Sequence, residues 1–182
     1  MTPPRNWGAT PDEIAAVYPC DALGFAHDEA FFRATDVAAP PALAFRWLCQ
    51  LRAAPYSYDW LDNFGRRSPP RLVPGLERLE AGQRVMLIFR IAGFEDGRTL
   101  TVRLASAPGR ALMGDFAGTY RVLAAPGGSR IVAKVLVRYP RGAYGAALRR
   151  LMPHADLFMF RKQLLTLRRY AERDAREAAA PR

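Results

Sequence analysis

Residues 54–63, APYSYDWLDN, bring three aromatic rings and two carboxylates into one short segment, and no other stretch of the chain is so rich in both. Aromatic faces line cavities for apolar molecules, and a tyrosine hydroxyl in such a wall is a polar handle for a ligand. Tyr56, Tyr58 and Trp60 are therefore candidate lining residues. The alternative is that the three rings pack as ordinary core.

The carboxylates of the same segment, Asp59 and Asp62, are three residues apart and would share one face of a helix. In a cavity wall they would orient a polar group of the ligand. Buried carboxylates need partners, however, and Arg52, Arg66 and Arg67 are close in sequence. A structural ion pair is therefore the alternative for both acids.

Acid–base chemistry needs a titratable group in the cavity. His154 is one of two histidines and lies near Asp156 in sequence. Because histidine titrates near neutral pH, His154 is a candidate general base, and Asp59 is the other candidate. The alternative for His154 is a surface or capping residue beside Pro153.

The stretch LFMFRKQLL, residues 157–165, places Arg161, Lys162 and Gln163 inside an apolar run. One of the three must therefore point inward or snorkel. Arg161 would either reach Asp59 or Asp62 in an ion pair or meet a carboxylate of the ligand.

The two cysteines, Cys20 and Cys49, form no CxxC or Cys–His spacing, and the glycine-rich turns match no nucleotide-binding pattern. No GxSxG or HExxH motif occurs. The sequence therefore predicts no metal site and no bound cofactor. Cys49, within FRWLCQL, is expected to be a small buried hydrophobic residue.

Hydrophobic periodicity places these residues on a series of elements. Residues 29–38 alternate as a strand, residues 40–51 have helical spacing, and residues 56–64 form a second short helix or a tight connector. Segments with a period of two follow, and the short turns between them predict an antiparallel sheet. These segments are residues 84–94, 99–105, 116–123 and 130–139. One face of the sheet is apolar, and the other is expected to meet water. The second face carries Arg90, Arg103, Arg121, Lys134 and Arg138.

Pro153 is expected to follow a short helix or turn that reaches Met152 and to begin a long helix over residues 153–177. Asp156 would then lie near the positive end of this helix. At 1.5 Å per residue the helix spans about 37 Å, so its last turns should protrude from a small domain. Its apolar stripe consists of Leu157, Phe160, Leu164 and Leu167.

At 182 residues the chain fits one domain, which we place at residues 29–173, after an irregular lead-in of residues 1–28 and before a frayed tail of residues 174–182. No apolar run is long enough for a membrane span and no secretory signal is recognised, so the expected location is the cytoplasm. The net charge of +10 raises nucleic acid or an anionic membrane as a partner. The cations are spread out and mixed with acids, which argues against nucleic acid.

The predicted order is strand, short helices, antiparallel strands and one long terminal helix, an α+β arrangement. The apolar face of the sheet must be covered, and the long helix is the element large enough to cover it. A curved sheet diverges from a single helix at its rim. We therefore expect an apolar cavity between them, with residues 54–63 in one wall.

This element order resembles the START-like, helix-grip superfamily, in particular its bacterial polyketide cyclase/dehydrase-like (SRPBCC) branch and the actinobacterial members of that branch. The resemblance covers about residues 29–173 and is carried by residues 46–69, 74–86 and 156–172. These read RWLCQLRAAPYSYDWLDNFGRRSP, PGLERLEAGQRVM and DLFMFRKQLLTLRRYAE. The resemblance implies a curved antiparallel sheet that grips the C-terminal helix. Members bind diverse hydrophobic ligands and only some are enzymes, and no shared catalytic motif transfers to this chain.

The leading hypothesis is that the chain binds a small hydrophobic or aromatic molecule, lipid-like or polyketide-like, in this cavity. The second is a polyketide cyclase or dehydratase that uses an acid or base in the same cavity. The third is an electrostatic binder of nucleic acid or of an anionic membrane. The candidate ligand-binding residues are Tyr56, Tyr58, Asp59, Trp60, Asp62, Phe89, Tyr120, Phe158, Phe160 and Arg161.

Overall fold

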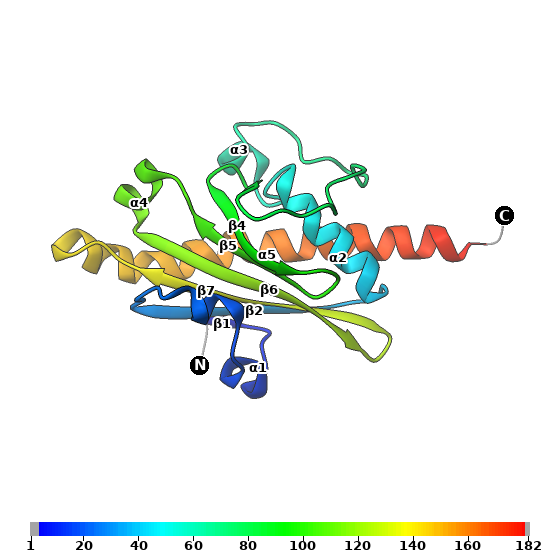
Figure 1. Cartoon of the computed structure of the whole chain (residues 1–182), viewed down its shortest axis with the longest axis horizontal. Helices are drawn as coiled ribbons and strands as arrows, with labels where there is room; N and C mark the ends of the chain where they lie inside the picture. The colour runs from blue at the N-terminus through cyan, green and yellow to red at the C-terminus, as the bar shows by residue number, and fades with distance from the viewer. Residues whose placement is uncertain (1–3, 181–182) are drawn as a thin grey trace.

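Seven strands form one curved sheet in the computed structural model, which describes residues 4–180 (Figure 1). The strand order across the sheet is β1-β2-β7-β6-β5-β4-β3. The strands are β1 Asn6–Trp7, β2 Glu29–Val37, β3 Arg84–Val85, β4 Phe89–Glu95, β5 Thr99–Leu104, β6 Asp115–Ala125 and β7 Gly128–Arg138. One long helix crosses one face of the sheet, so the predicted α+β helix-grip arrangement is confirmed.

The centre of the sheet is built from antiparallel neighbours, as the short turns predict. β6 and β7 pair over their whole length, from Asp115↔Arg138 to Ala125↔Gly128. β2 continues the antiparallel pattern on the other side of β7. The short β1 differs, because it pairs with β2 in parallel, at Asn6↔Phe32.

The segment predicted as one strand over residues 84–94 is divided in two, and this prediction was wrong. Met86 and Leu87 have φ of 45° and 63°, in the left-handed region, and they turn the chain between β3 and β4. The Met86 amide donates to the Leu51 carbonyl at 2.9 Å instead of to a neighbouring strand. The alternation of apolar residues continues through this turn, so periodicity alone hides the break.

The helices connect and cover the sheet. They are α1 Pro11–Ala15, η1 Pro19–Leu23, α2 Pro41–Cys49, η2 Gln50–Arg52, α3 Asp59–Asp62, α4 Ala107–Met113 and α5 Gly142–Ala179. The helix predicted after the first strand is confirmed as α2. The predicted boundary at Pro153 was wrong, because α5 is one helix and Pro153 lies inside it. No helix among residues 4–180 combines the length and apolar character needed to cross a bilayer.

Burial on both sides of Pro153 explains why α5 continues. Proline removes one intrahelical hydrogen bond at a cost of about 3 kcal/mol. Leu148 and Met152 pack on a cluster around Phe31 before the proline, and Leu164 and Leu167 are fully buried after it. Each fully buried leucine contributes about 1.5–3 kcal/mol, and the partly buried Leu148 and Met152 add to this, which offsets the lost bond. The last residues of α5 are exposed and extend beyond the sheet (Figure 1).

The main core lies between the inner face of the sheet, α2 and α5. Trp47 of α2 has no exposed surface, and its ring lies 4.9 Å from that of Tyr170 of α5. The Trp47 indole Nε1 donates to Asp174 at 2.9 Å. Cys49 is fully buried as predicted, and burial raises the pKa of its thiol to about 12.

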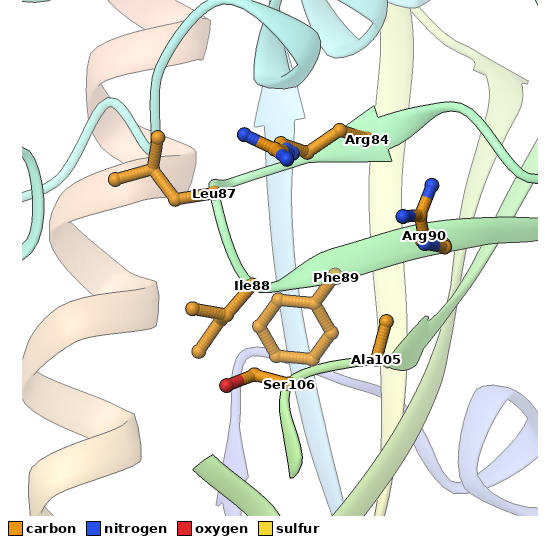
Figure 2. A pocket seen from close by; sticks show the side chains of 7 residues that line it. All are labelled: Arg84, Leu87, Ile88, Phe89, Arg90, Ala105 and Ser106. Carbon is orange, nitrogen blue, oxygen red and sulfur yellow. The ribbon is translucent and has the colours of Figure 1, made fainter. Parts of the chain in front are cut away.

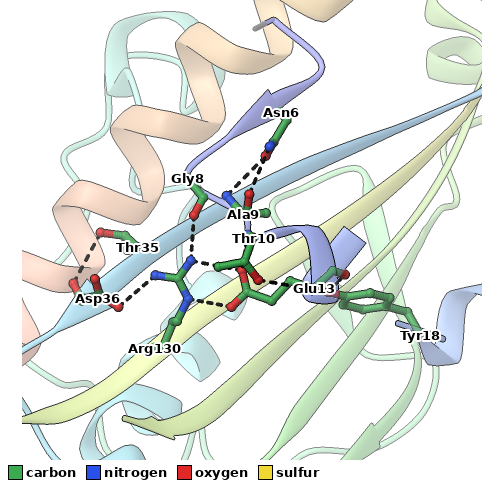
Figure 3. A network of polar contacts seen from close by, with 9 residues as sticks. All are labelled: Asn6, Gly8, Ala9, Thr10, Glu13, Tyr18, Thr35, Asp36 and Arg130. Carbon is green, nitrogen blue, oxygen red and sulfur yellow. Dashed lines mark hydrogen bonds and ion pairs between the residues drawn. The ribbon is translucent and has the colours of Figure 1, made fainter. Parts of the chain in front are cut away.

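The N-terminal segment covers part of the outer face of the sheet, which we expected to meet water. Tyr18 packs on Phe32 there, and Lys134 pairs with Asp21 at 2.6 Å. Arg130 of β7 fastens this segment, donating to Glu13 at 3.0 Å, to Asp36 at 2.8 Å and to the Gly8 carbonyl at 2.6 Å (Figure 3). The outer-face cations are therefore partners of the lead-in as well as surface charges.

Candidate functional site

The segment 54–63 begins as core. Tyr56 is 1% exposed, and its ring packs edge-on against Trp47 and Tyr170. Its hydroxyl donates to the Pro69 carbonyl at 3.0 Å, and burial raises its pKa. Tyr56 therefore joins α2 to α5 and holds the following loop, and its hydroxyl is engaged by the protein itself.

The other two aromatic residues of the segment lie at the surface. Tyr58 stacks on Phe158 of α5 with ring centroids 4.3 Å apart, and the Lys162 ammonium lies 6.0 Å from the Tyr58 ring. Phe158 is 54% exposed and Trp60 is 71% exposed. This part of the segment therefore packs on the solvent-facing side of α5 and not in the core.

The two carboxylates are held by serines, and the predicted alternative of an arginine partner was wrong. Asp59 accepts from the Ser68 amide at 2.8 Å and from the Ser68 hydroxyl at 2.5 Å. Asp62 accepts a hydrogen bond from the Ser57 hydroxyl. The neighbouring Arg52 donates to backbone carbonyls instead, including that of Leu76 at 2.8 Å.

Asp62 differs from Asp59 in having one oxygen without a partner. Its Oδ1 is buried and has no hydrogen-bond partner among residues 4–180. Burial raises the pKa of Asp62, and the hydrogen bond from Ser57 opposes this shift. A buried carboxyl that is easier to protonate than usual is one feature that general acids and bases share.

A chain of hydrogen bonds crosses the apolar interior between β6 and α5. The Tyr120 hydroxyl donates to Gln163 Oε1 at 2.7 Å, and Gln163 Nε2 donates to the Pro55 carbonyl at 2.8 Å. The Met86 sulfur lies 3.1 Å from Gln163 Nε2. We predicted that one of Arg161, Lys162 and Gln163 points inward. The structure shows that this residue is Gln163.

Aromatic rings pack around these hydrogen-bonded side chains. The Tyr120 ring stacks on Phe160 at 5.3 Å between centroids, and Tyr120 is 2% exposed. Phe89 and Phe160 are partly buried against both inner clusters of the core. Three candidate lining residues, Phe89, Tyr120 and Phe160, thus lie on the inner side of the sheet and helix.

A hollow of about 170 Å³ opens at the turn between β3 and β4. Figure 2 shows Leu87, Ile88 and Phe89 along this turn, with Ala105 and Ser106 on the facing strand end. Arg84 and Arg90 complete its lining. Met86, which contacts Gln163, directly precedes Leu87 in the chain. The turn that lines the hollow is therefore continuous with a residue of the interior.

A second hollow, of about 770 Å³, lies where β7 passes into α5 and includes Tyr139, Ala146 and Arg150. Both hollows are open to solvent. We expected an apolar cavity between the sheet and α5, but large side chains occupy the middle of this space. Trp47, Tyr56, Tyr120 and Leu164 are each at most 2% exposed there.

Backbone strain gathers around the first hollow and the segment 54–63. Among residues 4–180, the non-glycine residues with positive φ are Tyr56, Phe64, Met86 and Leu87. Such residues cost about 1–3 kcal/mol each and cluster at binding sites and switch regions. Tyr56 lies in the segment 54–63, Phe64 directly follows it, and Met86 and Leu87 form the β3–β4 turn.

A buried ion pair is a feature that we did not predict. Arg33 has no exposed surface, and its guanidinium donates to Asp156 at 2.6 and 3.0 Å and to the Arg5 and Phe32 carbonyls. Burial raises the pKa of Asp156, and Arg33 opposes this shift. The sequence could have indicated that Arg33 points inward. Alternate residues of a strand face the same side, and Arg33 alternates with the inward Phe31 and Val37.

Two other candidates lie away from the inner cluster. His154 is exposed on α5. Arg161 is also exposed, and its guanidinium lies 5.7 Å from the centre of the Trp7 ring in β1. The structure brings neither side chain to the two aspartates in an ion pair among the described residues.

Comparison with solved structures places this fold among known ones. The Zhui aromatase/cyclase from Streptomyces sp. R1128 is 20% identical, with a TM-score of 0.52 over 84% of this chain and 99% of that chain. The di-domain aromatase/cyclase BexL from the BE-7585A biosynthetic pathway is 17% identical, with a TM-score of 0.51 over 79% of this chain. StfQ, the di-domain aromatase/cyclase of the steffimycin pathway, is 16% identical with a TM-score of 0.50.

These likenesses show the fold: the chain has the helix-grip fold that polyketide aromatase/cyclases have. It spans about half of the two di-domain proteins, 50% of BexL and 51% of StfQ. No protein-family model and no curated protein matches the sequence.

Proposed function

We propose that this chain binds a small hydrophobic or aromatic molecule, lipid-like or polyketide-like, that enters at the hollow between β3, β4 and the end of β5. The observation that carries the proposal is the position of this hollow. Of its apolar residues, Ile88 and Phe89 pack on the same cluster as Phe160, and Leu87 lines the hollow beside them. Solvent thus meets the inner aromatic residues at this point.

The size of the hollow sets what it holds without rearrangement. Its volume of about 170 Å³ is similar to the roughly 150 Å³ of an engineered protein cavity that takes up benzene. Because the hollow is open to solvent, one aromatic ring would lie beside Ile88 and Phe89 with part of its surface exposed. A larger ligand would reach Tyr120 once Phe160 and Met86 move, and the strained turn at Met86 and Leu87 is the segment that we expect to move.

A titration with a neutral naphthalene dye, whose emission shifts in apolar surroundings, tests this proposal. We expect saturable binding to the purified chain. Ala105→Trp, at an exposed position that lines the hollow, should weaken binding at least about 10-fold, which is 1.4 kcal/mol. The reason is that the indole occupies the volume that the dye would take.

Ala146→Trp is the matched control, because Ala146 is also exposed and lines the second hollow. It should leave the affinity unchanged. Equal affinities of the wild type and Ala105→Trp would contradict the proposed entry point, and absence of saturable dye binding to the wild type would contradict the proposed function.

Asp62 favours a second candidate function, a cyclase or dehydratase. A carboxyl with a buried, unpartnered oxygen and a raised pKa suits proton removal next to a carbonyl and return of that proton to a departing hydroxyl. A linear poly-β-ketone thioester is the probe. The wild type should cyclise it faster than buffer alone, whereas Asp62→Asn should lose this acceleration and Asp59→Asn should lose less. Equal rates with and without the wild-type chain would exclude this candidate.

A further inference from the structure

Exposed apolar side chains gather on one region of the molecule. Of the twelve exposed large hydrophobic residues among residues 4–180, eight belong to α3 and residues 63–67 directly after it, the β3–β4 turn, α4 and the first half of α5. These eight are Trp60, Leu61, Phe64, Leu87, Leu112, Tyr144, Leu151 and Phe158. Exposed apolar groups that lie together mark interaction sites on soluble proteins, so this region is a candidate docking surface.

The first half of α5 is the centre of this region. Tyr144, Leu151 and Phe158 are 49%, 66% and 54% exposed and are spaced seven residues apart. A seven-residue spacing keeps side chains within about 20° per step of one helix face. They therefore form a continuous apolar stripe on the outside of α5.

Contacts join this stripe to α4 and α3. The Tyr144 hydroxyl donates to the Leu112 carbonyl of α4 at 2.6 Å, and Figure 1 shows α4 beside the first half of α5. At the other end of the stripe, Phe158 stacks on Tyr58, which directly precedes α3. The apolar side chains of the three helices thus belong to one surface, which we call the α3–α5 surface.

Positive charges outnumber negative ones in and directly beside these segments. Seven exposed cations lie there and form no ion pair among residues 4–180. They are Arg66, Arg67, Arg84, Arg110, Arg141, Arg150 and Lys162. Asp156 of α5 is paired with the buried Arg33. No acidic residue occurs from Phe116 to Ala155, and Asp59 and Asp62 are bonded to serines.

Charge decides between the possible partners. A second copy of the chain, docked by the same stripe, would bring these cations against one another. An anionic surface would neutralise them while its apolar layer receives the tyrosine, leucine and phenylalanine side chains. A helix with an apolar face and arginines beside it lies flat in the interface of an anionic bilayer.

We propose that the α3–α5 surface docks the chain on the surface of an anionic membrane. The first half of α5 lies along the interface, with Leu151 and Phe158 in the acyl boundary and the arginines at the headgroups. Trp60, 71% exposed beside the stacked Tyr58, sits at the level of the headgroups, where amphipathic rings are favoured. This proposal goes beyond ligand binding and does not depend on it.

Co-sedimentation with vesicles tests the proposal on the full chain. The vesicles contain phosphatidylcholine alone, or phosphatidylcholine with about a third of phosphatidylglycerol. We expect binding to the anionic vesicles, at least about 10-fold weaker binding to the neutral ones, and a loss between about 0.1 M and 0.5 M salt. Leu151→Glu should weaken binding to anionic vesicles about 10-fold or more, because it places a carboxylate in the apolar boundary.

Val17→Glu is the control for Leu151→Glu, since it makes the same charge change at a distant site. Val17 is 78% exposed and belongs to the N-terminal segment that packs on the outer face of the sheet. It should bind as the wild type does, and the thermal unfolding of both variants shows whether they fold. Failure of the wild type to bind anionic vesicles overturns the proposal and leaves an acidic protein as the partner. Equal losses in Leu151→Glu and Val17→Glu also overturn it, because binding would then follow net charge and not this surface.

Discussion

Asp62 is the residue whose protonation the structure perturbs in the most testable way. Its pKa is raised because it is buried, so the folded chain holds this proton more tightly than the unfolded chain does. The stability from this difference is complete below the ordinary value near 3.8 and is lost as the pH rises through the folded pKa. At neutral pH the ionised Asp62 therefore weakens the fold.

Asp62→Asn should consequently stabilise the protein at pH 7, because the amide copies the neutral carboxyl. The melting temperature should exceed that of the wild type at pH 7, and the two should converge below about pH 4. Asp59→Asn is the comparison, and it should destabilise at pH 7 because Ser68 donates twice to the Asp59 carboxylate. An Asp62→Asn protein that melts lower than the wild type at every pH would contradict the assignment.

Single residues differ in how far their environment could be predicted from sequence. The burial of Cys49 and the need for an inward polar residue at 161–163 follow from the apolar runs around them. The serine partners of Asp59 and Asp62 do not, because Ser68 is brought back to Asp59 by a loop whose path depends on Tyr56 and Phe64 at positive φ. Sequence patterns contain no signal for non-glycine residues in that region.

At the scale of elements, one ion pair joins β2 to the middle of α5. Asp156→Ala should reduce the free energy of unfolding by about 3–5 kcal/mol, because it leaves the fully buried Arg33 without its carboxylate. Chemical denaturation measures this loss.

The double variant Arg33→Met/Asp156→Leu should recover most of that stability, since it removes both charges together and fills the space with apolar atoms. A double variant as unstable as Asp156→Ala would show that packing, and not the unpaired charge, causes the loss. An unchanged stability of Asp156→Ala would mean that the pair does not fasten α5 to the sheet.

Element boundaries were predictable where local pattern and tertiary packing agree. In the antiparallel strands the apolar residues alternate, and in α2 they recur at helical spacing, in agreement with the residues that are buried. The pattern misled at Pro153, where local preference favours a helix start but packing of Leu148 and Leu164 on both sides keeps α5 continuous. It also misled at Met86 and Leu87, where a turn interrupts an unbroken alternation.

At the scale of the whole molecule, the order of elements determined the architecture, but the interior differs from the expected one. A curved sheet and a single helix were expected to leave an apolar void. The space is instead occupied by Trp47, Tyr56, Tyr120 and Tyr170, and the hollows lie at the rim, beside the β3–β4 turn and where β7 passes into α5. Sequence gives the number of large side chains but not how many of them enter the interior.

The rim therefore combines an entry point for an apolar ligand with a neighbouring apolar and cationic surface. Leu87 belongs to both, since it lines the hollow and is 38% exposed. The two proposals remain separable, because Ala105→Trp changes the hollow and Leu151→Glu changes the α5 stripe.

Hydrogen exchange with and without the naphthalene dye, followed by mass spectrometry of peptides, is the most direct test of where an apolar molecule binds. Bound dye should slow exchange in residues 84–90 and 158–163, which hold the hollow, Phe160 and Gln163. Slower exchange confined to residues 139–150 at the second hollow, or no change in residues 84–90, would contradict binding between the sheet and α5.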